Sequence, residues 1–148
     1  MEREQASKFL HDLLRLMASK NGSDLFLTAE FPPAFKIDGK ETPVSSVPLT
    51  SQHTVELARA LMNDRQASEF ESKKEVNFAI SPSGIGRFRV NAFMQLGRVG
   101  IVLRTIKSEI PSVEQLQLPV ILSELALTKR GLIIVVGTTG SGKSNTLA

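Results

Sequence analysis

The stretch VNFAISPSGIGRFRVNAFMQLGRVGIVLRTI (76–106) has the clearest strand pattern in the chain. Residues 76–80, 86–95 and 98–106 combine β-branched or aromatic residues with polar neighbours. Turn residues separate these runs at 82–84 and at Leu96-Gly97. The stretch therefore predicts an antiparallel meander of three strands.

Two arginines of this meander are predicted to face each other. The period of two places Arg87 and Arg89 on one face of the middle strand and Phe88 on the other. If Leu96-Gly97 is a two-residue turn, Arg89 lies directly opposite Arg104. Like charges so placed destabilise a hairpin, and either arginine changed to a neutral residue should then raise stability. The pair is favourable if a phosphate group lies between or above the guanidinium groups.

Other interpretations of the arginines remain open. Each could extend into solvent or pair with Glu75 or Glu109, and a longer turn would shift the register. A basic ribbon could also bind nucleic acid, with Phe88 or Phe93 as a stacking surface. The small aromatic content of 5% and the predicted burial of Phe88 argue against nucleic acid.

The region before the meander predicts both helices and short strands, so the fold class is α+β. Leu10, Leu14 and Met17 recur at helical spacing, and the pattern stops at Asn21-Gly22. Strands are expected in 24–30 and 34–44, with a hairpin at Asp38-Gly39. A helix capped by Thr50 or Ser51 should follow, and then a shorter helix from an Asp64 cap through Phe70.

Composition excludes several classes of protein. The 148 residues carry a net charge of +3, which is too small to argue for a nucleic-acid or membrane partner. The sequence has no cysteine and only two histidines, so a disulfide framework or a histidine metal cluster is not expected. No apolar run approaches the length of roughly 20 residues that spans a bilayer, which predicts a soluble protein.

A change of pattern marks a domain boundary within KSEIPSVEQLQLP (107–119). After it, residues 120–129 predict a helix. The continuous apolar run LIIVV (132–136) is typical of a parallel strand covered on both faces. Because a single parallel strand is unstable by itself, we expect this tail to fray or to pair with a neighbour.

The run is followed by the phosphate-loop pattern G-x-x-x-x-G-K-[ST], here GTTGSGKS (137–144). Glycines let successive backbone N–H groups turn toward phosphate oxygens without a Cβ clash. Lys143 should reach the β- and γ-phosphates of ATP, and the hydroxyl of Ser144 should bind Mg²⁺. Hydrolysis also needs an acidic Mg²⁺ ligand and a group that orients water. Both are expected beyond Ala148, so we expect no turnover and no tight ATP binding by this chain, which the early stop predicts to be truncated.

Three stretches together resemble a known family: residues 22–40, residues 77–106, and LPVILSELALTKRGLIIVVGTTGSGKS (118–144). They are similar to the secretion ATPases of type II secretion and type IV pili, specifically the PilT/PilU-type retraction motors, with the PilU branch most similar. The resemblance implies a PAS-like domain at 1–108, a linker at 109–118 and the start of a RecA-like ATPase domain at 119–148. It also implies a homo-hexameric ring with ATP and Mg²⁺, which drives pilus retraction and twitching motility at the cytoplasmic face of the inner membrane.

The resemblance assigns roles to individual residues. Arg89 and Arg104 match arginines that reach nucleotide phosphates, and no catalytic residue falls within the chain. The implied nucleotide-binding residues are Gly137, Thr138, Thr139, Gly140, Ser141, Gly142, Lys143, Ser144 and Asn145. Phe26 replaces a histidine of many relatives, and Asn145 replaces a common threonine.

The family also implies a PilT-like sister motor and an inner-membrane platform protein as partners, and no nucleic acid. Two alternative functions remain. The chain could be a PAS-like assembly or binding module without nucleotide function. It could instead belong to a pilus-assembly or type II secretion ATPase of the same superfamily.

Overall fold

The computed structural model describes residues 2–107, 111–138 and 141–147 of the chain. The chain divides into two compact units, residues 1–106 and 107–148. The predicted linker at 109–118 and the predicted domain start at 119 both fall within the second unit, and that finer division stays a prediction. Among the described residues, no helix combines the length and the apolar character needed to cross a bilayer.

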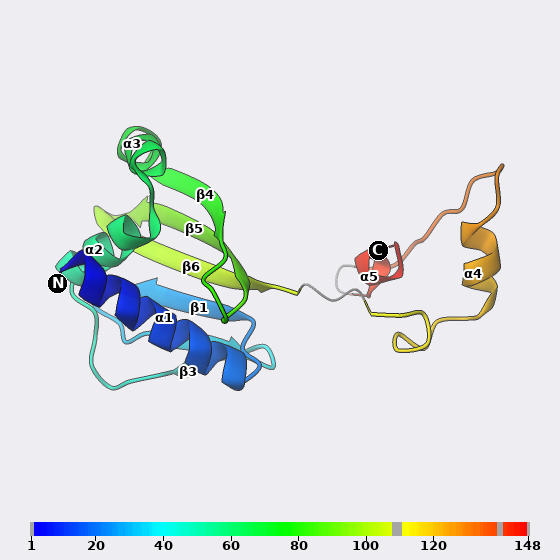
Figure 1. Ribbon diagram of the computed structural model, residues 1–148, viewed down its shortest axis with the longest axis horizontal. Coiled ribbons are helices and arrows are strands. Elements are labelled where there is room, and N and C mark those ends of the chain that lie inside the picture. The colour runs from blue at the N-terminus through cyan, green and yellow to red at the C-terminus, as the bar shows by residue number, and fades with distance from the viewer. Residues whose placement is uncertain (1, 108–110, 139–140, 148) are drawn as a thin grey trace. The chain divides into compact units, whose positions relative to one another are not determined.

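A six-stranded antiparallel sheet with the order β3-β2-β1-β6-β5-β4 forms the base of the first unit (Figure 1). Its strands are β1 (Asp24–Thr28), β2 (Ala34–Ile37), β3 (Lys40–Pro43), β4 (Glu75–Ile80), β5 (Arg87–Gln95) and β6 (Arg98–Ile106). The predicted three-strand meander is confirmed as β4-β5-β6. It joins the first three strands through the pairing of β1 with β6, which places the first and last strands at the centre of the sheet.

Two-residue turns close two of the hairpins, as the sequence predicts. Asp38 and Gly39 connect β2 to β3 with φ angles of 49° and 78°, and Leu96 and Gly97 connect β5 to β6 with φ angles of 51° and 74°. Positive φ at both central residues matches the twist of the adjoining strands. Gln95 therefore pairs with Arg98, and the register of the whole β5–β6 hairpin follows from this turn.

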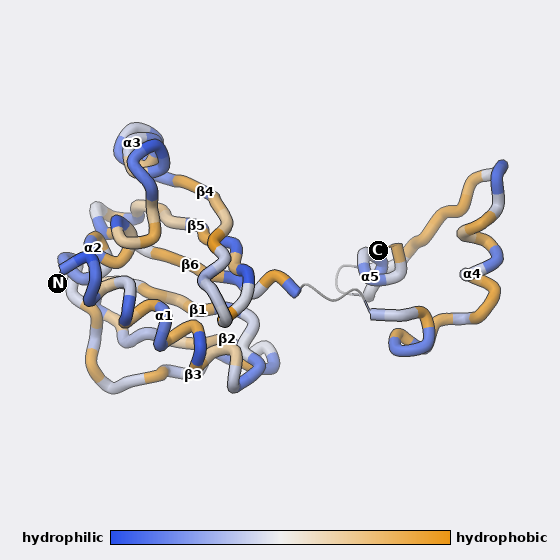
Figure 2. The backbone as a smooth tube through the Cα atoms, in the orientation of Figure 1, coloured by the Kyte–Doolittle hydropathy of each residue, from blue (hydrophilic) through white to orange (hydrophobic). Residues whose placement is uncertain are grey.

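Helices α1 (Arg3–Ser19) and α2 (Ser51–Leu61) pack against each other and against the central strands β1 and β6. The buried side of α1 consists of Ala6, Leu10, Leu13, Leu14 and Met17. Figure 2 shows the corresponding alternation of apolar and polar segments along this helix. The helices share one core with buried strand residues such as Leu27 and Leu103. Since strand side chains alternate in direction, the intervening residues form a second, outer face of the sheet.

The short helix α3 (Asp64–Lys73) begins one residue earlier than predicted, because Asn63 rather than Asp64 is its cap. The Asn63 side chain accepts a hydrogen bond from the backbone N–H of Gln66, and the Gln66 side chain accepts one from the Asn63 N–H. Thr50 caps α2 in the same way with His53. Asp64 lies in the first turn, where its charge favours the helix dipole.

The described residues of the second unit form two short helices, α4 (Ile121–Ala126) and α5 (Lys143–Leu147). Residues 132–136 form no strand, and Leu132, Ile134 and Val136 are exposed. This differs from the predicted buried strand. The physical reason is that the described part of this unit holds no second strand to satisfy the backbone N–H and C=O groups of the run.

Candidate functional site

The described residues of the phosphate loop bring Gly137 and Thr138 into contact with Ser141 and Lys143. A Cβ atom at Gly137 would lie 2.5 Å from the Ser141 Oγ atom, so this position accepts only glycine without a local shift. Gly142 has a φ of 88°, a conformation that glycine adopts readily, and α5 begins at the next residue. The predicted residues Thr139 and Gly140 lie outside the described residues.

The Lys143 ammonium group is bound to the loop itself. Its Nζ atom donates hydrogen bonds of 2.7 Å to the Gly137 carbonyl and 2.5 Å to the Thr138 carbonyl. The Ser141 hydroxyl donates a 2.7 Å bond to the same Thr138 oxygen. An ammonium group has three N–H donors, so one donor of Lys143 has no partner among the described residues. An anion at this loop can bind the remaining donor directly or replace one of the carbonyls as a partner of Lys143.

Ser144 and Asn145 are exposed in the first turn of α5. The hydroxyl of Ser144 is an oxygen ligand of the kind that Mg²⁺ prefers. In residues 2–107, 111–138 and 141–147 no group of three or more His, Cys, Asp or Glu side chains could hold a metal ion. One serine hydroxyl can serve as a single ligand of a magnesium ion, which usually takes its other oxygens from water and phosphate, and the ion at this loop stays a prediction.

The sheet of the first unit places Arg89 directly opposite Arg104, so the predicted register is confirmed. Both residues are exposed, whereas Phe88 and Val90 are buried on the other face. Phe88 is therefore a core residue and is not available to stack on a base. Phe93 lies across Gly100, where a Cβ atom would be 2.8 Å from the aromatic ring.

The partner of Arg104 is Asp24, which the sequence interpretation missed. The Arg104 Nε atom donates a 2.8 Å hydrogen bond to Asp24 Oδ1. The two residues are also directly paired between β1 and β6. Of the proposed partners, Glu75 instead accepts a hydrogen bond of 2.9 Å from Asn91, and Glu109 lies outside the described residues. A single Asp at the start of an otherwise apolar strand was the available signal, but it identified no partner without the β1–β6 pairing.

Asp24 is almost fully buried, with 4% of its surface exposed. Burial opposes its ionisation, but hydrogen bonds from Arg104 and Ser23 and the charges of Arg104 and Lys36 outweigh burial. The pKa of this carboxyl therefore lies below its usual value of 3.8. The Ser23 hydroxyl donates to Asp24 Oδ2 at 2.8 Å. Asp24 is thus a buried carboxylate with both oxygens bound.

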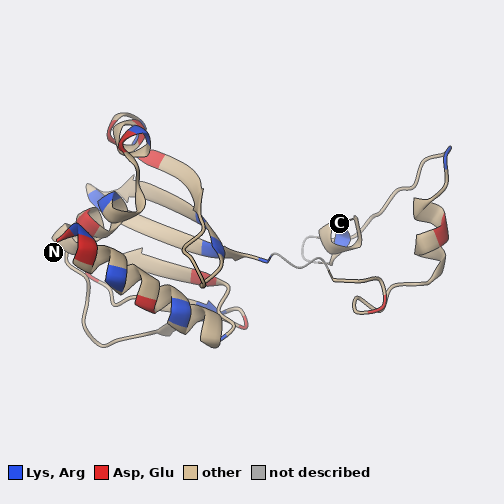
Figure 3. Cartoon of the chain, viewed as in Figure 1, with Lys and Arg blue, Asp and Glu red and all other residues tan. Residues whose placement is uncertain are grey.

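The Arg89–Arg104 pair belongs to a row of charged residues that crosses the outer face of the sheet. From one edge to the other, directly paired positions are Glu41 in β3, Lys36 in β2, Asp24 in β1, Arg104 in β6, Arg89 in β5 and Ala79 in β4. The charges alternate in sign until Arg104 meets Arg89. Figure 3 shows how acidic and basic positions are distributed over the elements. Arg89 makes no ion pair among the described residues, and the residue directly opposite it in β6 carries the same charge.

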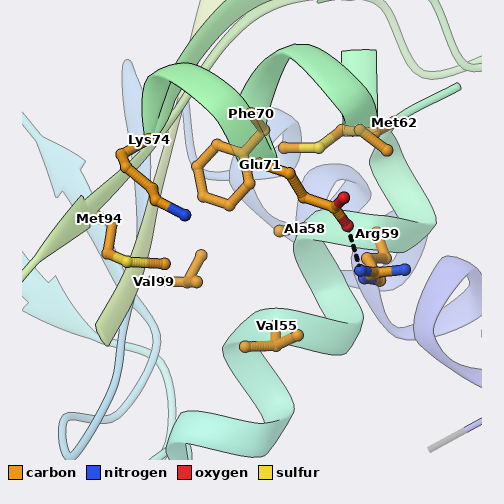
Figure 4. Close-up of a pocket in the computed structure, with 10 residues that line it drawn as sticks. Val55, Ala58, Arg59, Met62, Phe70, Glu71, Lys74, Met94 and Val99 are labelled. Carbon is orange, nitrogen blue, oxygen red and sulfur yellow. Dashed lines mark hydrogen bonds and ion pairs between the residues drawn. The ribbon is translucent and has the colours of Figure 1, made fainter. Parts of the chain in front are cut away.

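An apolar pocket of about 140 Å³ lies in the first unit between α2, α3 and the β5–β6 hairpin (Figure 4). It is lined by Val55, Ala58, Arg59, Met62, Ala67, Phe70, Glu71, Lys74, Met94 and Val99. Arg59 and Glu71 form a 2.5 Å ion pair at this pocket. The sequence interpretation did not predict the pocket, whose lining is apolar apart from Arg59, Glu71 and Lys74.

No family model matches the chain. The type IV pilus ATPase PilU of Pseudomonas aeruginosa is 55% identical over 136 residues, which cover 92% of this chain and 36% of PilU. The type IV pilus retraction ATPase PilT of the same organism is 39% identical, covering 93% of this chain and 40% of PilT.

Among solved structures, the pilus retraction motor PilT with bound ADP aligns with a TM-score of 0.82 and 36% identity. The alignment covers 93% of this chain and 40% of that structure. The chain is a homologue of the pilus retraction ATPases. It matches their amino-terminal part, spans about two-fifths of their length, and is more similar to PilU than to PilT. The α+β class with an antiparallel sheet is confirmed, and the PAS-like label stays a prediction.

Proposed function

We propose that this chain is the amino-terminal part of a PilU-like ATPase that couples ATP binding and hydrolysis to type IV pilus retraction. The observation that carries the proposal is the contact of Lys143, the first residue of α5, with the carbonyls of Gly137 and Thr138, which brings the two ends of the phosphate motif together. The homology to PilU and PilT, and the ADP bound in the PilT structure, support the same site.

The loop would bind the phosphates of ATP. Lys143 would exchange the carbonyls of Gly137 and Thr138 for phosphate oxygens, and Ser144 would hold Mg²⁺. When bound, Mg²⁺ neutralises the charge of the phosphates and so assists transfer of the terminal group. Gly142 has no side chain and Ser141 has a small one, so the backbone N–H groups there would be accessible to the same phosphate oxygens.

The arginines of the outer sheet face would supply the second contact to the nucleotide. In this proposal Arg89 and Arg104 approach the phosphates, either of their own chain or of a neighbouring subunit. The direct pairing of Arg89 with Arg104 supports this role, since an anion would relieve the repulsion between the two guanidinium groups.

The working protein would be a homo-hexameric ring at the cytoplasmic face of the inner membrane. Its partners would be an inner-membrane platform protein and a PilT-like sister motor, and it would bind no nucleic acid. The 148-residue chain itself should not hydrolyse ATP, because the acidic Mg²⁺ ligand and the water-orienting group of this enzyme class are expected outside its sequence.

The proposal is tested by ATPase assays on the full-length protein with Lys143→Ala and, as the matched control, Lys129→Ala. Lys129 is an exposed lysine of the same unit that lies outside the loop. We expect Lys143→Ala to lower kcat/KM by about 10²-fold or more, since it removes a charge that contacts the reacting phosphates. Lys129→Ala should match the parent. Equal activity in both variants would exclude the loop as the nucleotide site.

Deletion of the gene distinguishes retraction from the alternative role in assembly. Loss of a retraction motor should leave pili on the cell surface while twitching motility disappears. Loss of an assembly motor should remove the pili themselves. Electron microscopy of the deletion strain shows whether pili are present on the cell surface. The same strain complemented with the parent gene is the control.

A further inference from the structure

Asp24 is held in place from two directions. Its Oδ2 atom accepts a hydrogen bond from the Ser23 hydroxyl, and the Ser23 backbone N–H donates a 2.8 Å bond to the Lys36 carbonyl in β2. On the other side, the Thr105 backbone N–H donates a 3.0 Å bond to the Ser23 carbonyl. The backbone next to the Asp24 carboxylate is therefore hydrogen-bonded to both neighbouring strands, β2 and β6.

The contact between Asp24 and Arg104 is strongly asymmetric in exposure. The Asp24 side chain is 5% exposed, whereas the Arg104 side chain is 68% exposed. Only the Nε atom of Arg104 bonds to the carboxylate, and its two Nη groups make no hydrogen bond to any described residue. The Asp24 carboxylate thus binds the Nε atom of Arg104 and leaves the N–H groups of its two Nη atoms available to a ligand.

Arg89 has no such support, although it lies directly opposite Arg104. No hydrogen bond or ion pair of the Arg89 side chain occurs among the described residues. The two arginines are therefore not equivalent: the guanidinium group of Arg104 is held by a carboxylate, and that of Arg89 is held by no described residue. A donor that is already oriented loses less conformational entropy when it binds a ligand.

We propose that Asp24 is a positioning residue that fixes the Arg104 guanidinium group for contact with a nucleotide phosphate. The proposal rests on the function proposed above, in which Arg104 reaches the phosphates. Asp24 also places a negative charge near the anion, which by itself would weaken phosphate binding. A positioning role and a mere countercharge therefore predict different kinetics.

The first experiment measures kcat and KM of the full-length protein with Asp24→Ala and Asp24→Asn. Alanine removes both acceptors of Arg104 and Ser23, whereas asparagine keeps one oxygen acceptor that can still accept from Arg104 and exchanges the other oxygen for an uncharged NH2 group. We expect Asp24→Ala to lower kcat about tenfold without raising KM, since a misplaced contact group costs rate. Asp24→Asn should keep more of kcat. If both variants keep the parent kcat and lower KM, Asp24 is only a countercharge and the proposal is overturned.

Combination with Arg104→Gln separates positioning from a structural role. If Asp24 acts through Arg104, Asp24→Ala causes no further loss of kcat in the Arg104→Gln background. An equal loss in both backgrounds would show a structural effect and overturn the proposal alone. If Arg104→Gln turns over ATP like the parent, the proposed phosphate contact of Arg104 fails, and the role of Asp24 fails with it.

The 148-residue chain allows a spectroscopic test that needs no turnover. Nitrogen-15 relaxation of the arginine side chains should show a rigid Nε atom in Arg104 and a mobile one in Arg89. Asp24→Ala should make Arg104 as mobile as Arg89, while Asp24→Asn leaves it partly restrained. Equal mobility of the two arginines in the parent chain would overturn the proposal.

Discussion

Strand β6 and the run at 132–136 have similar local sequences and different structures. RVGIVLRTI forms the centre of a sheet, where β1 and β5 pair with it on its two sides. LIIVV is at least as apolar, but it pairs with no strand among the described residues and remains largely exposed. An apolar run therefore becomes a strand only where neighbouring strands bind its backbone N–H and C=O groups and other residues cover its side chains.

The largest expected difference between these regions is in the response to truncated side chains. Leu103 in β6 is fully buried, whereas Ile134 is 71% exposed. Leu103→Ala should lower the free energy of unfolding by about 2–5 kcal/mol, because it leaves a cavity. Ile134→Ala should change it by less than about 0.5 kcal/mol. Urea denaturation followed by circular dichroism measures both values, and similar losses would show that 132–136 is packed in solution.

A second comparison within β5 and β6 concerns the paired arginines. Arg104→Gln leaves the buried Asp24 carboxylate without its charged partner, so stability should fall by about 1–3 kcal/mol. This corrects the expectation from sequence that a neutral residue at either position raises stability. That expectation is kept for Arg89→Gln. This variant removes the repulsion between the two guanidinium groups and should raise the free energy of unfolding by a few tenths to about 1 kcal/mol.

Melting temperatures test this difference, with Arg87→Gln as the control. We expect Arg89→Gln to raise the melting temperature and Arg104→Gln to lower it. Arg87 is exposed on the same face of β5 but pairs with Ile106 instead of an arginine. A shift of the same sign and size in all three variants would mean that general basicity, rather than the Asp24 contact, decides stability.

A smaller effect is expected in the pH dependence of the first unit. The pKa of Asp24 is depressed in the folded chain, so its contribution to stability is present above about pH 4 and is lost as the pH falls through the folded pKa. Asp24→Asn should therefore show a flatter decline in unfolding free energy between pH 5 and pH 3 than the parent. Parallel curves would mean that the contact with Arg104 does not persist in solution.

The smallest expected effect concerns the pocket between α2, α3 and the β5–β6 hairpin. Ala67→Leu adds apolar atoms to its lining and should stabilise the first unit by up to about 1 kcal/mol. The control is Ala126→Leu on α4, an exposed position with the same helix propensity change, which should have no effect on the first unit. A loss of stability in Ala67→Leu would show that the pocket closes in solution.

Sequence patterns predicted those parts of the fold that depend on local geometry. The turns Asp38-Gly39 and Leu96-Gly97 need positive φ, and the second of them fixes the register that brings Arg89 to Arg104. The β1–β6 pairing could not be predicted in this way, because about 80 residues separate its partners and no turn sets their register.

The candidate site follows the same division. The phosphate loop is a contiguous motif, so its residues were identified from the sequence, although their roles stay predictions. Asp24 could be identified as the partner of Arg104 only from the pairing of β1 with β6. The choice between Asn63 and Asp64 as the helix cap illustrates a smaller limit, since both residue types cap helices well and stand next to each other.

The end of β6 has a mechanical consequence. Arg104 lies two residues before Ile106, where the first unit ends and the chain continues into the second. A pull on the chain at residue 107 would be carried into the sheet by the bonds that the end of β6 makes on both sides: the pairing of Ile106 with Arg87 in β5, and the bonds of Thr105 to Ser23 and of Arg104 to Asp24. Force applied at this point is therefore shared between both neighbouring strands, and Arg104 is among the residues that bear it.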